Sequence, residues 1–238
     1  MAEASTDVLT IRTGLVNVYM IDHGGELTLV DASLRGSLAR IRRALARHGR
    51  RLEEVRRVFV THAHIDHVGG LAELRAATGA EVIAHVLEAP YVRGEAHQPR
   101  PASSELGPFD RLMARLDGGH PPAAAVQREV DDGASLDDVA PGAVAIHLPG
   151  HTPGQAGLWL SRERLLLAGD LAFHFLPWRL TLPFAAFTSD MAQALRSLER
   201  AAALEPVGLG LGHGSMLHSG AAAALRRLAA RHRHRFSA

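Results

Sequence analysis

Four side chains able to bind a metal ion lie within six positions, as His62-x-His64-x-Asp66-His67. Imidazole nitrogen and carboxylate oxygen are zinc ligands, and catalytic zinc sites keep one coordination position open for water. Residues 58–60 are apolar and predict a short buried strand, so the run occupies the loop that follows it. In an extended loop alternate side chains point the same way, so His62 and His64 suit one ion. Asp66 and His67 would point elsewhere, and the spacing therefore predicts two metal ions.

Three further candidate ligands, His151, Asp170 and His213, each follow an apolar stretch and lie beside a glycine. Taken singly, each has an ordinary structural explanation, because a histidine after a strand often makes hydrogen bonds and an aspartate there often caps a turn. The chain also contains 15 histidines, some of them in the basic tail at 231–235. Three such sites in this order nevertheless favour a dinuclear metal centre.

The elements that must position these residues alternate between strands and helices. Apolar runs separated by turns predict a β-meander over residues 8–30, and a strand over 81–85. Apolar residues at helical spacing predict helices over 34–45, 68–79 and 191–202, the last capped by Asp190. The second half adds strands at 144–148, 157–160, 165–168 and 207–211, and a closing helix at 219–230.

Two segments lack this periodicity. Residues 88–130 collect six prolines around one expected helix at 109–116, and such a long irregular segment favours a functional lid over a spacer. Residues 171–188 are aromatic and irregular, and they either wall a substrate pocket or pack in the core. Within them, His174 either contacts substrate or is a packed structural residue, the second being the stronger interpretation.

Composition excludes several chemistries. The 238 residues contain no cysteine, which excludes disulfides, thiolate nucleophiles and cysteine-bound zinc. All 26 basic residues are arginine, which excludes a Schiff-base lysine. The net charge of +1 recommends neither nucleic acid nor a membrane surface as partner. The first ten residues lack a signal-peptide pattern, and no run could span a membrane, so we expect one cytoplasmic domain over residues 1–238. The oligomeric state stays open.

These motifs together resemble the metallo-β-lactamase superfamily. The matching segments are Thr61 to His67, the turn His151 to Gly154, Gly169-Asp170 and the turn Gly212 to Gly214, and residues 17–19 and 29–31 are similar to the family's opening strands. The resemblance implies an α/β (α+β) fold, a four-layer αββα sandwich, with the metals at one sheet edge. It also implies that the first zinc is held by His62, His64 and His151, the second by Asp66, His67 and His213, with Asp170 bridging both.

The same resemblance implies the chemistry. A metal-bridging hydroxide would attack an acyl carbon, because two zinc ions bring the pKa of water toward neutrality. Asp66 and Asp170 would be the catalytic carboxylates, the first orienting the hydroxide. Asp31 would support the metal site without binding a metal. Zinc is the expected metal, with iron or manganese as alternatives.

Departures from the family pattern narrow the substrate. Asp170 stands where one β-lactamase subclass has cysteine. This favours hydrolysis of a thioester, lactone or other ester of a small molecule over β-lactam hydrolysis. We retain β-lactam hydrolysis as a side activity. Gln155 replaces a histidine common in glyoxalase II and lactonases, and we expect the 25 residues after His213 to leave no room for a glutathione-binding domain. An iron-dependent redox enzyme resembling persulfide dioxygenases remains the alternative.

Overall fold

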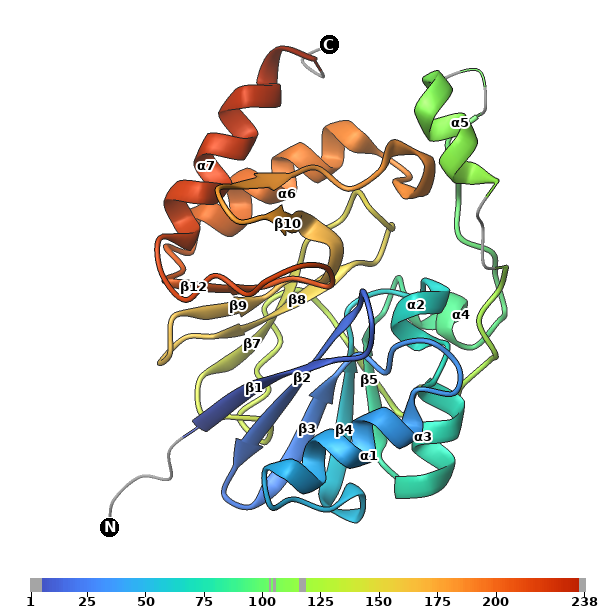
Figure 1. The fold of residues 1–238 in the computed structure, drawn as a ribbon, viewed down its shortest axis with the longest axis vertical. Coiled ribbons are helices and arrows are strands. Elements are labelled where there is room, and N and C mark those ends of the chain that lie inside the picture. Colours follow the sequence, from blue (N-terminus) through green and yellow to red (C-terminus); the bar gives the residue numbers. More distant parts are fainter. Residues whose placement is uncertain (1–5, 103, 105, 116–118, 236–238) are drawn as a thin grey trace.

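Two β-sheets face each other, and helices cover the outer face of each sheet (Figure 1). This arrangement comes from a computed structural model, which describes residues 6–102, 104, 106–115 and 119–235. Within these residues no helix combines the length and the apolar character that crossing a bilayer requires.

The first sheet has six strands in the order in which they follow along the chain. They are β1 (Thr6–Arg12), β2 (Asn17–His23), β3 (Glu26–Val30), β4 (Val55–Val60), β5 (Glu81–His85) and β6 (Arg128–Val130). The first three pair antiparallel, which confirms the predicted meander, and β3 to β6 pair parallel. The carboxyl ends of β3, β4 and β5 therefore lie at one edge.

The second sheet has four strands in the order β12-β9-β8-β7. Their bounds are β7 (Ala143–His147), β8 (Ala156–Leu160), β9 (Leu165–Leu167) and β12 (Gly208–Gly210). Strands β7, β8 and β9 pair antiparallel, whereas β12 runs parallel to β9. All four agree with the predicted strands to within two residues at each end.

Alternating side chains explain the layers, because successive residues of a strand point to opposite faces of the sheet. On β2, Val18 and Met20 pack with the helices outside the first sheet, whereas Tyr19 and Ile21 pack between the two sheets. A third apolar cluster lies between the second sheet and its own helices. Three apolar interfaces separate four layers, and the predicted αββα sandwich is confirmed.

The covering helices are α1 (Leu38–Arg47) and α3 (Leu71–Thr78) on the first sheet, and α6 (Met191–Ala203) and α7 (Ala221–His232) on the second. The Asp190 side chain accepts a hydrogen bond of 2.8 Å from the Gln193 amide, which confirms the predicted cap of α6. The helix predicted from Leu34 begins only at Leu38, after a turn at residues 34–37.

The helix predicted over 68–79 is interrupted at Gly69 and Gly70. A short helix, α2 (Ile65–Val68), precedes the break, and α3 follows it. A Cβ atom on either glycine would overlap backbone atoms of residues 32–35 or of Ile65, so the chain passes too closely there for a side chain. The break lets the chain just after β3 pack against α2, where the Ala32 amide donates to the His67 carbonyl over 2.8 Å.

The two segments without periodicity contain more structure than the sequence indicates. Residues 88–130 contain α4 (Ala89–Val92) and α5 (Pro108–Ala114); Leu116, at the end of the predicted helix, lies outside the described residues. Residues 171–188 are not irregular as expected, since β10 (Phe173–Leu176) and β11 (Arg179–Thr181) form a hairpin, followed by a 3₁₀ turn, η4 (Ala185–Phe187). The register of the hairpin shifts between the pairs Phe173–Thr181 and Leu176–Arg179.

Candidate metal centre

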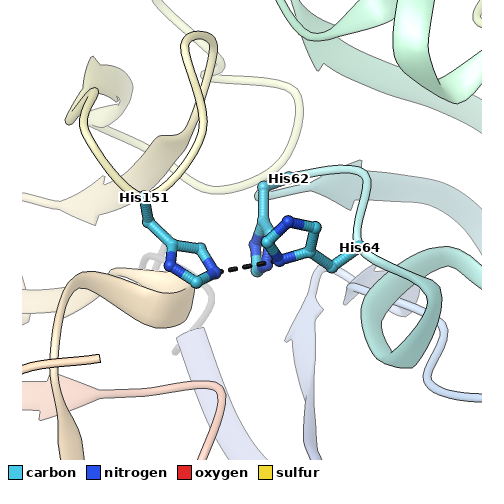
Figure 2. Close-up of side chains that lie close together, drawn as sticks. All are labelled: His62, His64 and His151. Carbon is cyan, nitrogen blue, oxygen red and sulfur yellow. Dashed lines mark hydrogen bonds between the residues drawn. The ribbon is translucent and has the colours of Figure 1, made fainter. Parts of the chain in front are cut away.

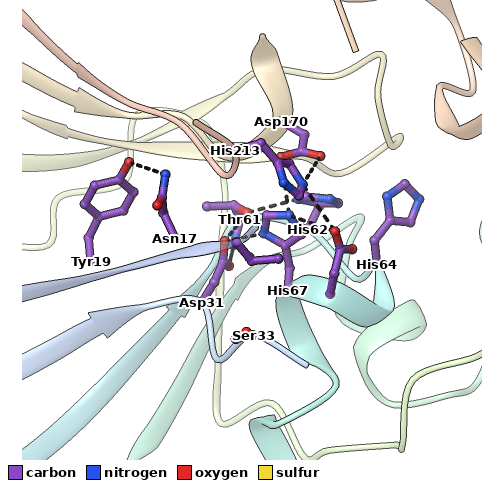
Figure 3. A network of polar contacts seen from close by, with 12 residues as sticks. Asn17, Tyr19, Asp31, Ser33, Thr61, His62, His64, His67, Asp170 and His213 are labelled. Atoms are coloured by element: carbon purple, nitrogen blue, oxygen red, sulfur yellow. Dashed lines mark hydrogen bonds and ion pairs between the residues drawn. The ribbon is translucent and has the colours of Figure 1, made fainter. Parts of the chain in front are cut away.

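The seven predicted ligands meet at one edge of the sandwich, where loops from both sheets come together. Figure 3 shows His62, His64, His67, Asp170 and His213 there. The seven lie in the loop after β4 and in α2 (His62, His64, Asp66, His67), in the turn between β7 and β8 (His151), in the 3₁₀ turn η3, Gly169–Leu171 (Asp170), and after β12 (His213).

One group consists of His62, His64 and His151, which face each other across the two sheets (Figure 2). One ring nitrogen from each lies within 4.8 Å of the others. The nearest pair is His64 Nδ1 and His151 Nε2, 2.9 Å apart. Three imidazoles gathered in this way match the set expected for the first metal.

A second group consists of Asp66, His67 and His213, whose ligand atoms also lie within 4.8 Å of one another. Asp66 Oδ2 lies 3.2 Å from His213 Nε2 and 3.9 Å from His67 Nε2. This is the set expected for the second metal.

Asp170 lies between the two groups. Its Oδ1 atom is 3.3 Å from His67 Nε2, and its Oδ2 atom is 3.5 Å from His151 Nε2 and 3.4 Å from His213 Nε2. Its carboxylate thus reaches histidines of both groups, which is the position a bridging ligand requires.

Hydrogen bonds at the far side of two rings set which nitrogen has a free lone pair. His67 Nδ1 donates to Asp31 Oδ2 over 2.7 Å, a carboxylate that can only accept. Asp31 also accepts from the Thr61 amide and hydroxyl, both at 2.8 Å. Because the Thr61 hydroxyl donates its hydrogen to Asp31, its oxygen accepts a hydrogen bond from His62 Nδ1 at 3.0 Å. In the neutral rings the lone pair is therefore on Nε2 and faces the centre, and Asp31 supports the site as expected.

The same arrangement recurs on the other side of the centre. His213 Nδ1 donates to the Leu15 carbonyl over 2.9 Å. His151 Nδ1 lies 3.1 Å from the hydroxyl of Thr188, and that hydroxyl donates to the Phe184 carbonyl. The Thr188 oxygen therefore accepts from His151, whose Nε2 lone pair also points inward. Sequence reasoning missed Thr188, because nothing in the sequence joins it to a residue 37 positions away.

Several inward-facing atoms lack a hydrogen bond within the described part of the chain. They are His62 Nε2, His67 Nε2 and Asp170 Oδ1, all buried. Buried polar atoms are rarely left without a partner, because each costs about 1–3 kcal/mol. Bound cations would satisfy these lone pairs, so the residues fit a metal centre.

The three imidazoles of the first group are neutral. Burial lowers the pKa of His64 to about 4 and that of His151 to about 3, and the neighbouring imidazoles lower the pKa of His151 further. Burial also holds the pKa of His62 well below its usual value. Neutral imidazoles offer lone pairs without first losing a proton, which suits cation binding.

The second group instead pairs opposite charges. Burial would lower the pKa of His213, but Asp170 and Asp66 raise it to about 10. Asp170, Asp66 and Asp31 likewise outweigh burial and raise the pKa of His67. Burial would raise the pKa of Asp66, but His67 and His213 lower it to about 2. Protons here occupy the positions that a cation would take.

A cavity of about 680 Å³ opens onto both groups. His64, Asp66, His151, Asp170 and His213 form its floor. Its walls come from both segments expected to enclose a pocket, including Tyr91 and Met113 from 88–130 and Phe173, Phe175, Phe184 and Phe187 from 171–188. The aromatic segment therefore faces the cavity.

Two residues left open by the sequence have structural positions. His174 is buried and its Nδ1 atom donates to the Ser215 carbonyl over 2.6 Å, in agreement with a packed structural histidine. Gln155 is buried too, and its amide donates to the Leu148 carbonyl at 3.3 Å. Neither lines the cavity.

Gly212 offers a direct test of how tightly the centre is packed. A Cβ atom there would overlap Asp170 Oδ1 and the His67 ring. We expect Gly212→Ala to weaken metal binding at least about 10-fold, because the ligands must move. Competition with a chromophoric chelator measures this, and Gly107→Ala, where an added Cβ meets no neighbour, is the control. Equal affinities of Gly212→Ala and wild type would contradict the packing described here.

Comparisons with known proteins identify the family. Residues 11–213 match the family model of the metallo-beta-lactamase superfamily. Probable metallo-hydrolase YflN of Bacillus subtilis (strain 168) is 31% identical, over 89% of this chain and 85% of that protein. A hydroxyacylglutathione hydrolase of Methylococcus capsulatus is 29% identical over 79% of this chain, but the match spans only 57% of that enzyme.

Solved structures show the same fold. The metallo-beta-lactamase family protein TTHA1429 of Thermus thermophilus superposes with a TM-score of 0.71 at 24% identity, covering 97% of this chain and 80% of that one. TTHA1623, solved in a di-iron-bound form, has a TM-score of 0.64 at 25% identity, covering 88% of this chain and 93% of that one. The chain therefore belongs to the metallo-β-lactamase superfamily, and it is a hydrolytic enzyme of that family.

Proposed function

We propose that the protein hydrolyses an ester-like acyl bond of a small molecule, a thioester or lactone, at two metal ions, zinc in the first instance. Asp170 would bridge them, His62, His64 and His151 would hold the first ion, and Asp66, His67 and His213 the second. One observation supports this most strongly: seven candidate metal ligands lie together, and five of them form the floor of a cavity with largely apolar walls.

Metal ions bound there would lower the pKa of a water molecule and polarise the scissile carbonyl. Asp66 has about a third of its side chain exposed and lines the cavity, and its low pKa keeps it ionised. It would accept a hydrogen bond from the attacking water and hold that water's lone pair toward the acyl carbon. Asp170, which is buried, would keep the two groups of histidines at a fixed separation.

The cavity walls favour an acyl group over a charged substrate, because phenylalanine rings bind apolar carbon chains. Relatives named hydroxyacylglutathione hydrolase act on a thioester, and the matches cover 57% and 52% of two of them. Together with the apolar walls, this leads us to propose a thioester or lactone whose acyl part binds against the phenylalanine rings. β-Lactam hydrolysis would be a side activity.

Hydrolysis of a panel of thioesters, lactones and β-lactams by metal-loaded protein tests the function. His62→Ala serves as the blank, because His62 belongs to two of the three ligand clusters. A thioester or lactone should be cleaved fastest. If wild type cleaves no member of the panel faster than the blank, the proposed acyl hydrolysis is wrong.

An iron-dependent redox reaction at the same ligands is the second candidate, favoured by the di-iron-bound form of TTHA1623. Metal analysis of protein purified without added metal separates the two. Zinc with hydrolysis supports the first function, whereas iron alone with oxygen consumption supports the second.

Phe187 tests the acyl specificity. It lines the cavity, and removing its ring should raise KM about 10-fold for the longest acyl chains and little for acetyl esters, because longer chains bury more apolar surface against the cavity walls. Trp178→Ala is the matched control, since Trp178 lies in the same segment, is 75% exposed and does not line the cavity. Equal effects on short and long chains would contradict this assignment.

A further inference from the structure

Glu88 is a buried carboxylate outside the ligand set. It follows β5 and precedes α4, and its side chain has no exposed surface. Carboxylates are rarely buried so completely, since removing the charge from water is costly unless each oxygen is well hydrogen-bonded. Its position therefore calls for an explanation that the hydrolytic mechanism alone does not give.

The two oxygens of Glu88 accept four hydrogen bonds from three different segments. Oε1 accepts from the Ala63 amide at 2.7 Å and from the Gln98 side-chain amide. Oε2 accepts from the Thr152 hydroxyl at 2.8 Å and from the Gly154 amide at 3.0 Å. All four donors are neutral. Burial raises the pKa of Glu88 to about 7, although these hydrogen bonds act in the opposite direction.

The segments that Glu88 joins are the two loops that carry the first histidine group. Ala63 lies between His62 and His64, and Thr152 follows His151 directly. Those loops come from opposite sheets, so the separation of their imidazoles depends on what holds the loops together. One carboxylate with two acceptor oxygens connects them.

The loop that carries His151 also packs tightly against the chain around Glu88. A Cβ atom on Gly154 would overlap backbone atoms of Leu87 and Glu88, so this loop lies directly against the chain at the start of α4. The third segment is the cavity wall, because Gln98 both donates to Glu88 and lines the cavity. The wall and the histidine group therefore share one anchor.

We propose that Glu88 is a positioning residue that sets the geometry of the His62, His64 and His151 group, and that Gln98 couples the cavity wall to it. This rests on the proposed function only in that those histidines bind a metal. The carboxylate acts through the loops, since the structure gives it no contact with a ligand side chain. Glutamine cannot replace Glu88, because the NH2 group of glutamine would face two of the four donors and cannot accept hydrogen bonds from them.

Stepwise metal titration of Glu88→Gln against a competing chelator tests the proposal. We expect one of the two metal equivalents to bind about 10–100-fold more weakly, as is typical when a group that orients ligands is lost, and the other to bind as in wild type. Cobalt absorption spectra identify the site: the spectrum of Glu88→Gln should resemble that of His151→Ala and differ from that of His213→Ala. Asp137→Asn is the matched control, because Asp137 also braces a loop through two acceptor oxygens, at Gly142 and Ser135, but away from the metals.

Two results would overturn the proposal: both equivalents binding within twofold of wild type, or both weakened equally with a lower melting temperature of the metal-free protein. If Glu88→Gln fails to fold, Thr152→Val decides, since it removes one of the four hydrogen bonds and keeps the shape. It should weaken the same equivalent several-fold, and unchanged binding would reject the proposal. Wild type binding no metal would instead reject the proposed function.

Discussion

Asp170→Ala should lower the rate of acyl hydrolysis by about three orders of magnitude. Metal ions stabilise the charge of an acyl-transfer transition state by several kcal/mol, and each 1.4 kcal/mol is worth about tenfold in rate. Asp170 is the carboxylate that reaches His67, His151 and His213, so its loss affects both groups of ligands. The variant should also bind fewer than two metal ions per chain. Steady-state hydrolysis and metal analysis of the same samples measure both effects.

Asp170→Asn and Asp22→Ala complete this experiment. The amide keeps the shape of Asp170 but loses its charge, so Asp170→Asn should lose most of the activity as well. Asp22 pairs with Arg50 near the carboxyl end of β2, whereas the metal centre lies at the other end of that strand. Replacing Asp22 should leave the rate of hydrolysis within twofold of wild type. An Asp170→Ala protein that binds two metal ions and retains a tenth of the activity would show that Asp170 is not the bridge.

That the seven candidate ligands lie together is predictable from sequence, because these histidines and aspartates coincide with strand ends. Turn caps and structural hydrogen bonds can explain a single histidine or aspartate after an apolar run, but they hardly explain seven. The carboxyl ends of neighbouring parallel strands also meet at one edge of the sheet. Strand β5, Glu81–His85, is predictable with its bounds for a related reason: it lies between a helix-ending glycine and a turn.

The supports of those ligands are not predictable in the same way. Glu88 acts through contacts with loops of both sheets, and Thr188 through a contact with a residue 37 positions away, neither of which a local pattern reports. A weak signal exists for Glu88, since an acidic residue just after a buried strand rarely has a purely apolar environment. Strand β10 escapes prediction because exposure does not alternate along it: Phe173 and His174 are both buried, whereas Phe175 is exposed.

Removing the metals should abolish hydrolysis, and rebinding zinc should restore it while the second group releases about two protons per chain near pH 7.5, in addition to any proton lost by a metal-bound water. His67 and His213 carry raised pKa values because Asp170 and Asp66 face them, so both are protonated without metal and must lose that proton to bind one. The imidazoles of the first group have lowered pKa values and release none. Metal affinity should therefore rise with pH up to about 10, the pKa of His213. Calorimetric titration in two buffers of different ionisation enthalpy counts the protons.

His213→Gln isolates one of these protons. It should release about one proton fewer than wild type, because glutamine carries none. His48→Gln, an exposed histidine at the end of α1, should release the same number as wild type. Zinc binding without proton release would mean that the carboxylates of the second group are not paired with charged imidazoles. In that case Asp66 and Asp170 would bind the metal as unpaired anions, and metal affinity would depend little on pH above about 6, the ordinary pKa range of histidine. The same titration therefore distinguishes a metal-free site with protonated histidines from one with neutral histidines.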